Sequence, residues 1–392
     1  MAGSYAGTTA TDLINVYDPT FWAQESLAQL FPMLRMTGLM YRSFEGTVAA
    51  QGDLVNTRMP GTFVASDVNP DSFASNKPQA ENVAIKLDKW KQVVFEIGDR
   101  EQSLSLKGLQ DEFAFPAAFA LAAAVEDAAI DLHKDVYQTI GVAGTTPSTV
   151  ASLGTDIKQA FDVAQVPDQG RQVVLGPQAV NKFNQVFYQD YVSGSTDQQT
   201  TGQLRPKFGM LYSDSNKLPN HVNGTAFTSA TPLVNGNQTA NGGAVIRPGQ
   251  LPGAGTVNLK ALATGGTINQ GDVFSIGGQT YTSTTTQTIT GTTATVAITP
   301  ILQTSPADGD SVTVTANHAI NLAFHNQAFA LVSRPLAVPN APGANVSVVN
   351  FNGIGLRSTV WYSPKDVRTY VRLDLLFGVR TLDARKAFRV LG

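Results

Sequence analysis

The chain has 392 residues, of which 42% are hydrophobic and only 15% are charged, and its formal net charge is −3. This length predicts more than one hydrophobic core, and so little charge predicts a surface that is largely neutral or is covered by another subunit. The absence of cysteine excludes disulfides and thiolate chemistry, and the weakly acidic balance argues against strong electrostatic capture of nucleic acid.

The first hundred residues predict an arm followed by a hairpin. Residues 1–50 begin with a polar stretch that lacks the features of a signal peptide, and a helix is predicted between Asp18-Pro19 and Pro32. Within 51–100, the segments Leu54–Met59 and Val83–Trp90 alternate apolar and polar residues, which is typical of strands. The polar, proline-containing stretch between them predicts a long β-hairpin that reaches away from its own subunit.

Residues 101–150 contain the strongest helix signal of the chain. Alanine dominates 117–129, and apolar residues recur at three- and four-residue steps from Leu121 to Ile140. We expect a helix of about 25 residues whose slim face lies against a sheet. Its acidic residues, Glu126, Asp127 and Asp131, are expected on a solvated or subunit-facing surface. The apolar run 117–125 is too short to span a bilayer, so no membrane contact is expected.

The composition of the rest of the chain changes twice. Residues 151–221 read as α/β, with helices near 153–166 and 178–189 around a buried strand at 172–175. Residues 222–317 contain only five charged residues and are rich in Thr and Gly, with short strand patterns between turn signals. This composition predicts a small all-β sandwich or barrel. Residues 318–392 again have the hydrophobic α/β pattern of 151–221. This order of segments predicts a β-domain inserted into a host domain.

No catalytic or metal-binding motif stands out along the chain. The histidines His133, His221, His318 and His325 lack the spacing that ligands on one element need, so each is expected to be structural. Asp308-Gly309-Asp310 predicts a β-turn rather than a calcium loop, because the other alternating acidic ligands are missing. No nucleotide-binding loop or nucleophile elbow is present. We therefore expect no enzyme activity, no cofactor and no metal.

The C-terminal segment from Arg357 is rich in basic residues. No aromatic stacking platform or nucleic-acid-binding motif accompanies them, so a protein interface is favoured over a nucleic-acid patch. The residues proposed as assembly contacts in this segment and in the predicted hairpin are Arg58, Lys77, Lys89, Arg357, Arg368, Arg372 and Arg380.

Three passages carry a family resemblance: His325–Leu336, which contains Arg334-Pro335; Leu373–Arg380, with Gly378 at a turn; and Gly209–Pro219. Together with the order of parts, they resemble tailed-bacteriophage major capsid proteins of the Hong Kong ninety-seven-like fold. The passage Ile268–Ile276 resembles the start of the β-barrel insertion found in Salmonella-phage-type coat proteins.

This resemblance implies an α+β fold in named parts. Residues 1–50 would be the N-terminal arm, 51–100 the extended hairpin called the E-loop, and 101–150 a peripheral domain with a long spine helix. Residues 151–221 would begin the axial domain, 222–317 would be the inserted all-β domain, and 318–392 would complete the axial and peripheral domains.

The implied function is structural. Copies of the chain would form hexamers and pentamers of an icosahedral shell that encloses double-stranded DNA without sequence-specific binding. The implied partners are scaffolding and portal proteins and, at the inserted domain, a decoration protein. The shell would assemble in the bacterial cytoplasm and become the virion capsid. Some relatives cross-link a hairpin lysine to a neighbouring subunit, but no motif fixes Lys77 or Lys89 in that role.

Two other functions remain as alternatives. An encapsulin-like compartment shell has the same fold, although the large insertion argues mildly against it. A β-rich adhesin or glycan-binding protein would account for 222–317 alone and would leave the alanine-rich helix unexplained.

Overall fold

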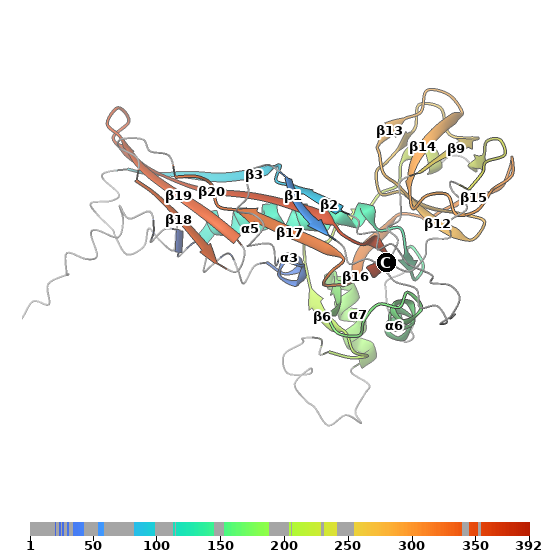
Figure 1. The fold of residues 1–392 in the computed structure, drawn as a ribbon, viewed down its shortest axis with the longest axis horizontal. Helices are drawn as coiled ribbons and strands as arrows, with labels where there is room; N and C mark the ends of the chain where they lie inside the picture. Colours follow the sequence, from blue (N-terminus) through green and yellow to red (C-terminus); the bar gives the residue numbers. More distant parts are fainter. Residues whose placement is uncertain are drawn as a thin grey trace, which may run out of the picture.

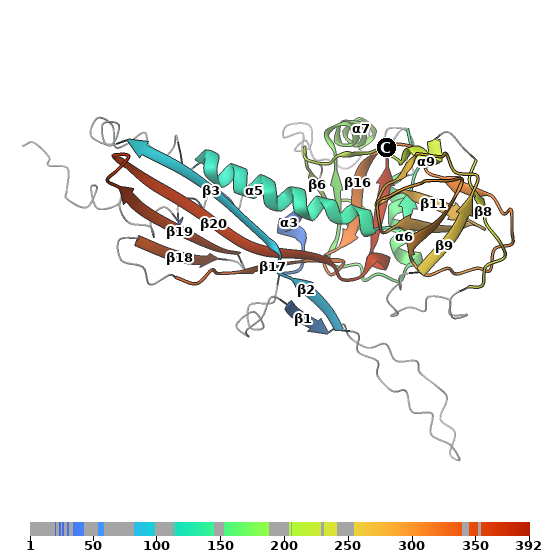
Figure 2. The same cartoon turned by 90° about the horizontal axis from the view of Figure 1, so that it is seen from above.

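A computed structural model describes residues 20, 23–24, 26, 30, 34–42, 54–58, 82–98, 113, 115–144, 153–187, 204, 206–228, 231–240, 255–338, 345–351 and 354–392. Figures 1 and 2 show a long sheet with one helix along it, an α/β lobe at the end of that sheet, and a small β-rich unit beside the lobe. The helix predicted between Asp18 and Pro32 lies largely outside the described residues, as do the predicted hairpin residues 59–81.

The long sheet is antiparallel and is organised around β20 (Arg368–Thr381), a strand of 14 residues. On one side β20 pairs with β3 (Lys89–Gly98), and on the other it pairs first with β19 (Ile354–Ser363) and then with β17 (Phe329–Arg334). β18 (Asn345–Phe351) pairs with β19. Alternate residues of β20, including Val371, Leu373 and Leu375, are fully buried, so one face of the sheet belongs to a core.

Helix α5 (Phe115–Ile130) covers the buried face of the long sheet (Figure 2). Its alanines, among them Ala118, Ala122 and Ala129, are buried in the same cluster as the β20 leucines. Small side chains let a helix approach a sheet closely, which explains why an alanine-rich sequence serves here. The short helix α3 (Met36–Leu39) packs against α5.

The helix is shorter than the predicted 25 residues. It tightens into a 3-10 turn, η3 (Asp131–Asp135), and the backbone is extended at Val136. β4 (Thr139–Ile140) then pairs in parallel with the C-terminal strand β21 (Ala387–Leu391). The helical apolar spacing continues to Ile140, but Ile140 belongs to strand β4. The prediction was wrong at this end because Ile140 pairs with a strand from the other end of the chain.

Two short strands pack beside the long sheet. β1 (Leu54–Arg58) and β2 (Asn82–Lys86) are antiparallel, with Leu54 opposite Lys86. Their apolar residues, including Val55 and Ile85, pack with Val332 of β17. Gly378 lies inside β20 rather than at the predicted turn, and a Cβ built on it would lie 2.2 Å from the carbonyl oxygen of Lys86. A glycine is needed here because the backbones of β2 and β20 nearly touch.

The α/β lobe contains a second sheet in the order β4-β21-β16-β5-β6. Its other strands are β5 (Arg171–Leu175), β6 (Leu211–Asp214) and β16 (His318–His325). Helices α6 (Leu153–Val163) and α7 (Pro177–Phe187) pack on it through Phe161 and Phe183. The short strand β7 (Asn220–His221) pairs with the start of β16.

The β-rich unit beside the lobe is a six-stranded barrel with its own core. The strand order is β15-β11-β12-β14-β9-β8, and a bridge between Leu233 and Ser311 joins the two ends of this order. These strands are β8 (Leu233–Val234), β9 (Gly255–Lys260), β11 (Val273–Ile276), β12 (Gln279–Ser283), β14 (Thr293–Thr299) and β15 (Val312–Val314). The short helix α9 (Thr225–Thr228) and the strand pair β10 (Thr267–Ile268) and β13 (Gln287–Thr288) belong to the same unit. The chain enters the barrel after β7 and returns at β16.

Candidate assembly surface

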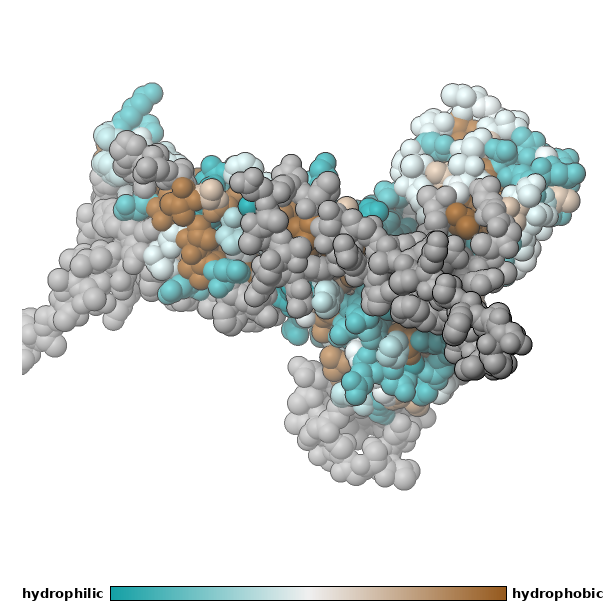
Figure 3. All heavy atoms as spheres, in the orientation of Figure 1, coloured by the Kyte–Doolittle hydropathy of each residue, from teal (hydrophilic) through white to brown (hydrophobic). Residues whose placement is uncertain are grey.

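The face of the long sheet turned away from α5 carries large, partly exposed side chains. This outer face is formed by Trp90, Gln92, Val94 and Glu96 of β3, by Arg368, Tyr370, Arg372 and Asp374 of β20, and by Arg357, Thr359 and Trp361 of β19. Trp90 is 55% exposed and Val94 is 45% exposed. In Figure 3, hydrophobic residues gather at the end of the molecule that holds the long sheet, while the barrel surface is mostly polar.

A buried carboxylate organises the middle of the outer face. Asp374 Oδ2 accepts hydrogen bonds from Arg357 Nη2 at 2.5 Å and Nε at 3.2 Å, and its Oδ1 accepts one from Arg372 Nε at 2.7 Å. Arg357 Nη1 also donates to the carbonyl of Ala337 at 3.0 Å. Because one carboxylate faces two guanidinium groups, this cluster keeps a net positive charge while both arginines are held in place.

Aromatic groups extend the outer face on either side of this cluster. The guanidinium of Arg372 lies 5.6 Å from the ring centre of Trp90, a cation–π distance. The rings of Trp361 and Tyr370 are stacked with their centres 5.4 Å apart. Tryptophan, tyrosine and arginine are the residue types most enriched at energetically important positions of protein interfaces. The chemistry of this face therefore suits contact with another protein.

The structure separates the predicted contact residues into groups. Arg357, Arg368 and Arg372 lie together on the outer face, where Arg368 pairs with Glu96. Lys89 begins β3 opposite Phe377, and Arg380 is exposed towards the far end of β20.

The remaining two predicted contacts belong to the hairpin. Arg58 is the last residue of β1, opposite Asn82 in β2. Lys77 lies outside the described residues.

Of the outer face, sequence reasoning predicted only the three arginines as contacts, so it missed the other eight residues, among them Trp90, Val94 and Asp374. The predicted strand ended at Trp90, whereas β2 ends at Lys86 and a separate strand, β3, continues to Gly98. The pattern after Trp90 contains consecutive apolar residues, so it lacks a simple alternation that would have extended the strand. Nothing in the local sequence distinguishes Asp374 as a buried pairing partner.

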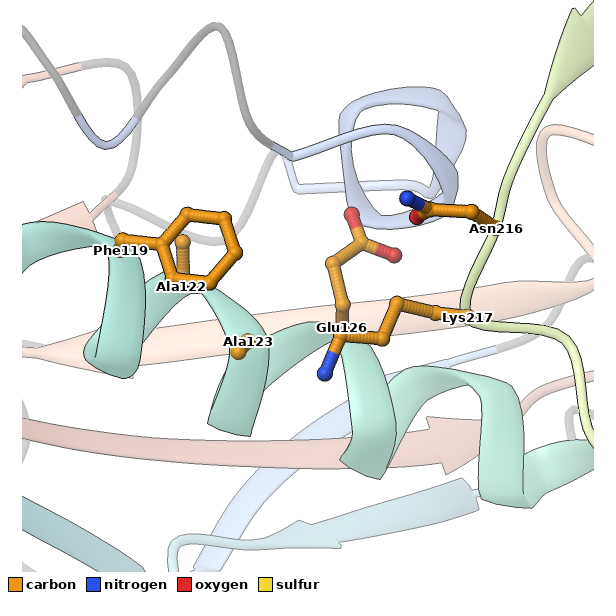
Figure 4. A pocket seen from close by; sticks show the side chains of 6 residues that line it. All are labelled: Phe119, Ala122, Ala123, Glu126, Asn216 and Lys217. Carbon is orange, nitrogen blue, oxygen red and sulfur yellow. The ribbon is translucent and has the colours of Figure 1, made fainter.

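A small depression lies on α5, between Phe119 and the loop that holds Asn216 and Lys217 (Figure 4). Glu126 reaches from α5 towards α3, where its carboxylate accepts hydrogen bonds from the backbone N–H groups of Met36 and Thr37, each at 3.2 Å. Burial raises the pKa of Glu126, although these bonds oppose the shift. The expectation that Glu126 would be a surface residue is therefore wrong, because it caps α3 instead.

The other two acidic residues of that predicted patch form ion pairs. Asp127 pairs with Lys217 at 3.5 Å, and Asp131 pairs with Lys134. In the barrel, Asp310 Oδ2 accepts a bond from Ala307 N at 2.8 Å, and Asp308 pairs with Lys260 at 2.5 Å.

Among the described residues, no group of three histidine or acidic side chains is placed to hold a metal ion. Within the same part of the chain, no helix is both long and apolar enough to cross a bilayer.

Comparisons with known proteins give matches in structure only. No protein-family model matches the sequence, and no curated protein matches it. The structure is similar to a chain from Mycobacterium phage Che8, with 14% identity, a TM-score of 0.50, and coverage of 91% of this chain and 90% of that one. It also matches the capsid structure of cyanophage P-SCSP1u, with 14% identity, a TM-score of 0.44, and coverage of 87% and 84%. A third match is the virus-like particle from Pyrococcus furiosus, with 7% identity, a TM-score of 0.42, and coverage of 94% and 97%.

The match to the Che8 chain extends over nearly the whole of both molecules. At this level of identity the match shows that this chain and the phage chain share a fold, which agrees with the fold that the sequence resemblance predicted.

Proposed function

We propose that this chain is the major capsid protein of a tailed phage, and that many copies assemble into an icosahedral shell around double-stranded DNA. The observation that carries the proposal is the fold shared with the Che8 chain over about nine-tenths of each molecule. A chain with this fold and few charged residues suits a shell, because neighbouring subunits would cover much of its surface.

The outer face of the long sheet supplies a physical reason for self-association. Trp90 is more than half exposed, and it lies beside arginines that Asp374 already orients. Pre-oriented side chains lose little freedom when a partner covers them, which favours binding. In the proposed shell, this face contacts a neighbouring copy within a hexamer or pentamer.

The finer parts of the proposal concern partners and location. The barrel would be the inserted domain of the Salmonella-phage type and the part that meets neighbouring capsomers or a decoration protein. Scaffolding and portal proteins would direct assembly in the bacterial cytoplasm. The enclosed DNA would be held without sequence-specific contacts, consistent with a net charge of −3.

The test is assembly of the purified chain, with and without scaffolding protein, followed by sedimentation and electron microscopy. Closed shells are the expected product. Trp90→Ala should make the association free energy of each subunit contact less favourable by about 2 kcal/mol, or about 30-fold in the association constant, because an interface tryptophan is a typical hot spot. Val163→Ala is the matched control, since Val163 is 76% exposed at the end of α6, away from the outer face.

Two outcomes of this test would contradict the proposal. One is a chain that stays monomeric under every assembly condition, and the other is a chain that assembles equally well with either substitution. The content of particles from producing cells separates the phage capsid from the encapsulin-like alternative. Nuclease-protected DNA supports the capsid, and an enclosed protein cargo supports the compartment.

A further inference from the structure

Two segments join the barrel to the α/β lobe, and they run side by side. β7 leads into the barrel and the start of β16 leads out, with His221 paired opposite His318. Asn223 N donates to Asn317 Oδ1 at 2.8 Å, and the Asn223 side chain donates to the carbonyl of Thr315. The two connections therefore form one paired neck rather than two independent linkers.

A buried acid ties the barrel to this neck. Asp272, in the turn before β11, is fully buried and accepts three hydrogen bonds through its carboxylate. The donors are His221 Nε2 at 3.0 Å, Gly224 N at 3.0 Å and Asn269 N at 2.8 Å. Two of these donors, His221 and Gly224, belong to the neck.

A buried cation ties the barrel to the rest of the lobe. Arg389 of β21 is fully buried, and its Nη1 donates to the carbonyl of Gly271 at 2.7 Å. Its Nη2 donates to the carbonyl of Lys134 in η3 at 3.2 Å and to Thr282 Oγ1 of the barrel at 3.3 Å. One guanidinium thus holds β21, η3 and the barrel together. Burial lowers the pKa of Arg389 to about 9, while Asp135 and Asp272 act in the opposite direction.

Three imidazoles lie close to one another here, and the charge of Arg389 acts on two of them, His133 and His318. The ring centre of His221 is 6.1 Å from that of His133 and 5.4 Å from that of His318. Nδ1 of His133 donates to the Ile130 carbonyl, and Nδ1 of His318 donates to the Ala316 carbonyl, each at 2.8 Å. His318 Nε2 is buried and has no hydrogen-bond partner among the described residues. A second proton, on Nε2 of His318, would therefore have no acceptor among the described residues, which favours the neutral ring.

We propose that His133 and His318, packed with His221 around Arg389 and Asp272, form an acid-sensitive joint that releases the barrel from the α/β lobe when these imidazoles are protonated. The charged groups around them are Lys134 and Asp135 of η3, Asp272 of the barrel and Arg389 of β21. Each added proton places a further cation beside Arg389 in a dry site. In the released state the imidazoles are hydrated, so protonating them costs far less free energy.

The pKa shifts of His133 and His318 give the direction of the release with pH and the pH range over which it occurs. Burial first, and then the charge of Arg389, lowers the pKa of His133 from 6.5 to about 3. Burial is also the main cause that lowers the pKa of His318, to about 4. Docking is therefore unaffected above pH 6.5 and weakens as the pH falls from 6.5 towards these values. With two such groups, the ratio of released to docked barrel should rise about 500-fold between pH 7 and pH 5.

The experiment measures the distance between the barrel and the lobe as the pH falls. The chain has no cysteine, so a Lys182→Cys and Thr293→Cys variant carries spin labels only on α7 and β14. Diluted with unlabelled chain and measured by double electron–electron resonance, it should show one narrow distance at pH 7.5 and a second, broad population between pH 6 and 5. The His133→Asn/His318→Asn variant should keep the narrow distance at pH 5, because asparagine can donate the same bonds without titrating.

His325→Asn is the matched control. His325 is a buried histidine of β16 whose pKa is also lowered by burial, but it contacts Gln169 and not the barrel. This variant should release the barrel at the same pH as the parent chain. The proposal is overturned if the distance is unchanged down to pH 4.5, or if the histidine double variant releases the barrel at the parent pH. It is also overturned if helical circular dichroism disappears together with docking, since the whole chain would then unfold at once.

Discussion

Replacement of Asp374 by asparagine tests whether its buried carboxylate organises the outer face of the long sheet. The substitution keeps the shape of the side chain and removes the charge that faces Arg357 and Arg372. Removing one partner of a fully buried ion pair costs about 3–5 kcal/mol. The side chains of Arg357 and Arg372 are 13% and 30% exposed, so water can partly replace the hydrogen bonds that they lose. We therefore expect Asp374→Asn to lower the free energy of unfolding by about 2–3 kcal/mol.

The assay is urea unfolding of the unassembled chain, followed by circular dichroism. Glu96→Gln is the matched control, because it removes the pair between Glu96 and Arg368, whose side chains are both 48% exposed. An exposed pair of this kind contributes about 0–1 kcal/mol. The reasoning is refuted if Asp374→Asn changes the stability by less than about 0.5 kcal/mol, or if both substitutions cost the same.

Two further substitutions test contacts that the fold makes through its backbone and its buried cation. Gly378→Ala should destabilise the chain by about 1–3 kcal/mol in thermal unfolding, because the new Cβ would meet the carbonyl oxygen of Lys86. Gly291→Ala should be nearly neutral, since nothing lies within 4 Å of a Cβ there, and equal effects would argue against the close approach of β2 and β20. Arg389→Met should broaden the barrel–lobe distance already at pH 7.5, because three hydrogen bonds of the joint are lost. Arg380→Met, at an exposed position, should leave that distance narrow, and a narrow distance in Arg389→Met would contradict the role given to this arginine.

Local patterns of the sequence predicted the elements whose residues repeat with one period. Helix α5 was found because helix propensity and apolar spacing agree in its alanine-rich run. Strand β5 was found because its short buried run contains two valines, which favour strands. The end of α5 was misplaced because Ile140 continues the helical spacing while its backbone pairs with Val390 at the other end of the chain.

The candidate surfaces depended on contacts between residues that are distant in the sequence. Arg357 and Arg372 were predicted as contacts from charge alone, but their shared partner Asp374 is defined by the register between β19 and β20. His133, His221 and His318 each seemed isolated because they are far apart along the chain. The pairing of β7 with β16 and the packing of η3 bring them together, and no local spacing could have indicated it.

The central claim is that copies of this chain form a closed shell in which neighbours cover the outer face of the long sheet. Cryo-electron microscopy of assembled particles, at a resolution that shows side chains, tests it most directly. The account predicts closed icosahedral particles in which a neighbouring copy covers Trp90 and the Arg357–Asp374–Arg372 cluster. Open or irregular aggregates, or closed particles that leave this face in solvent, would contradict it.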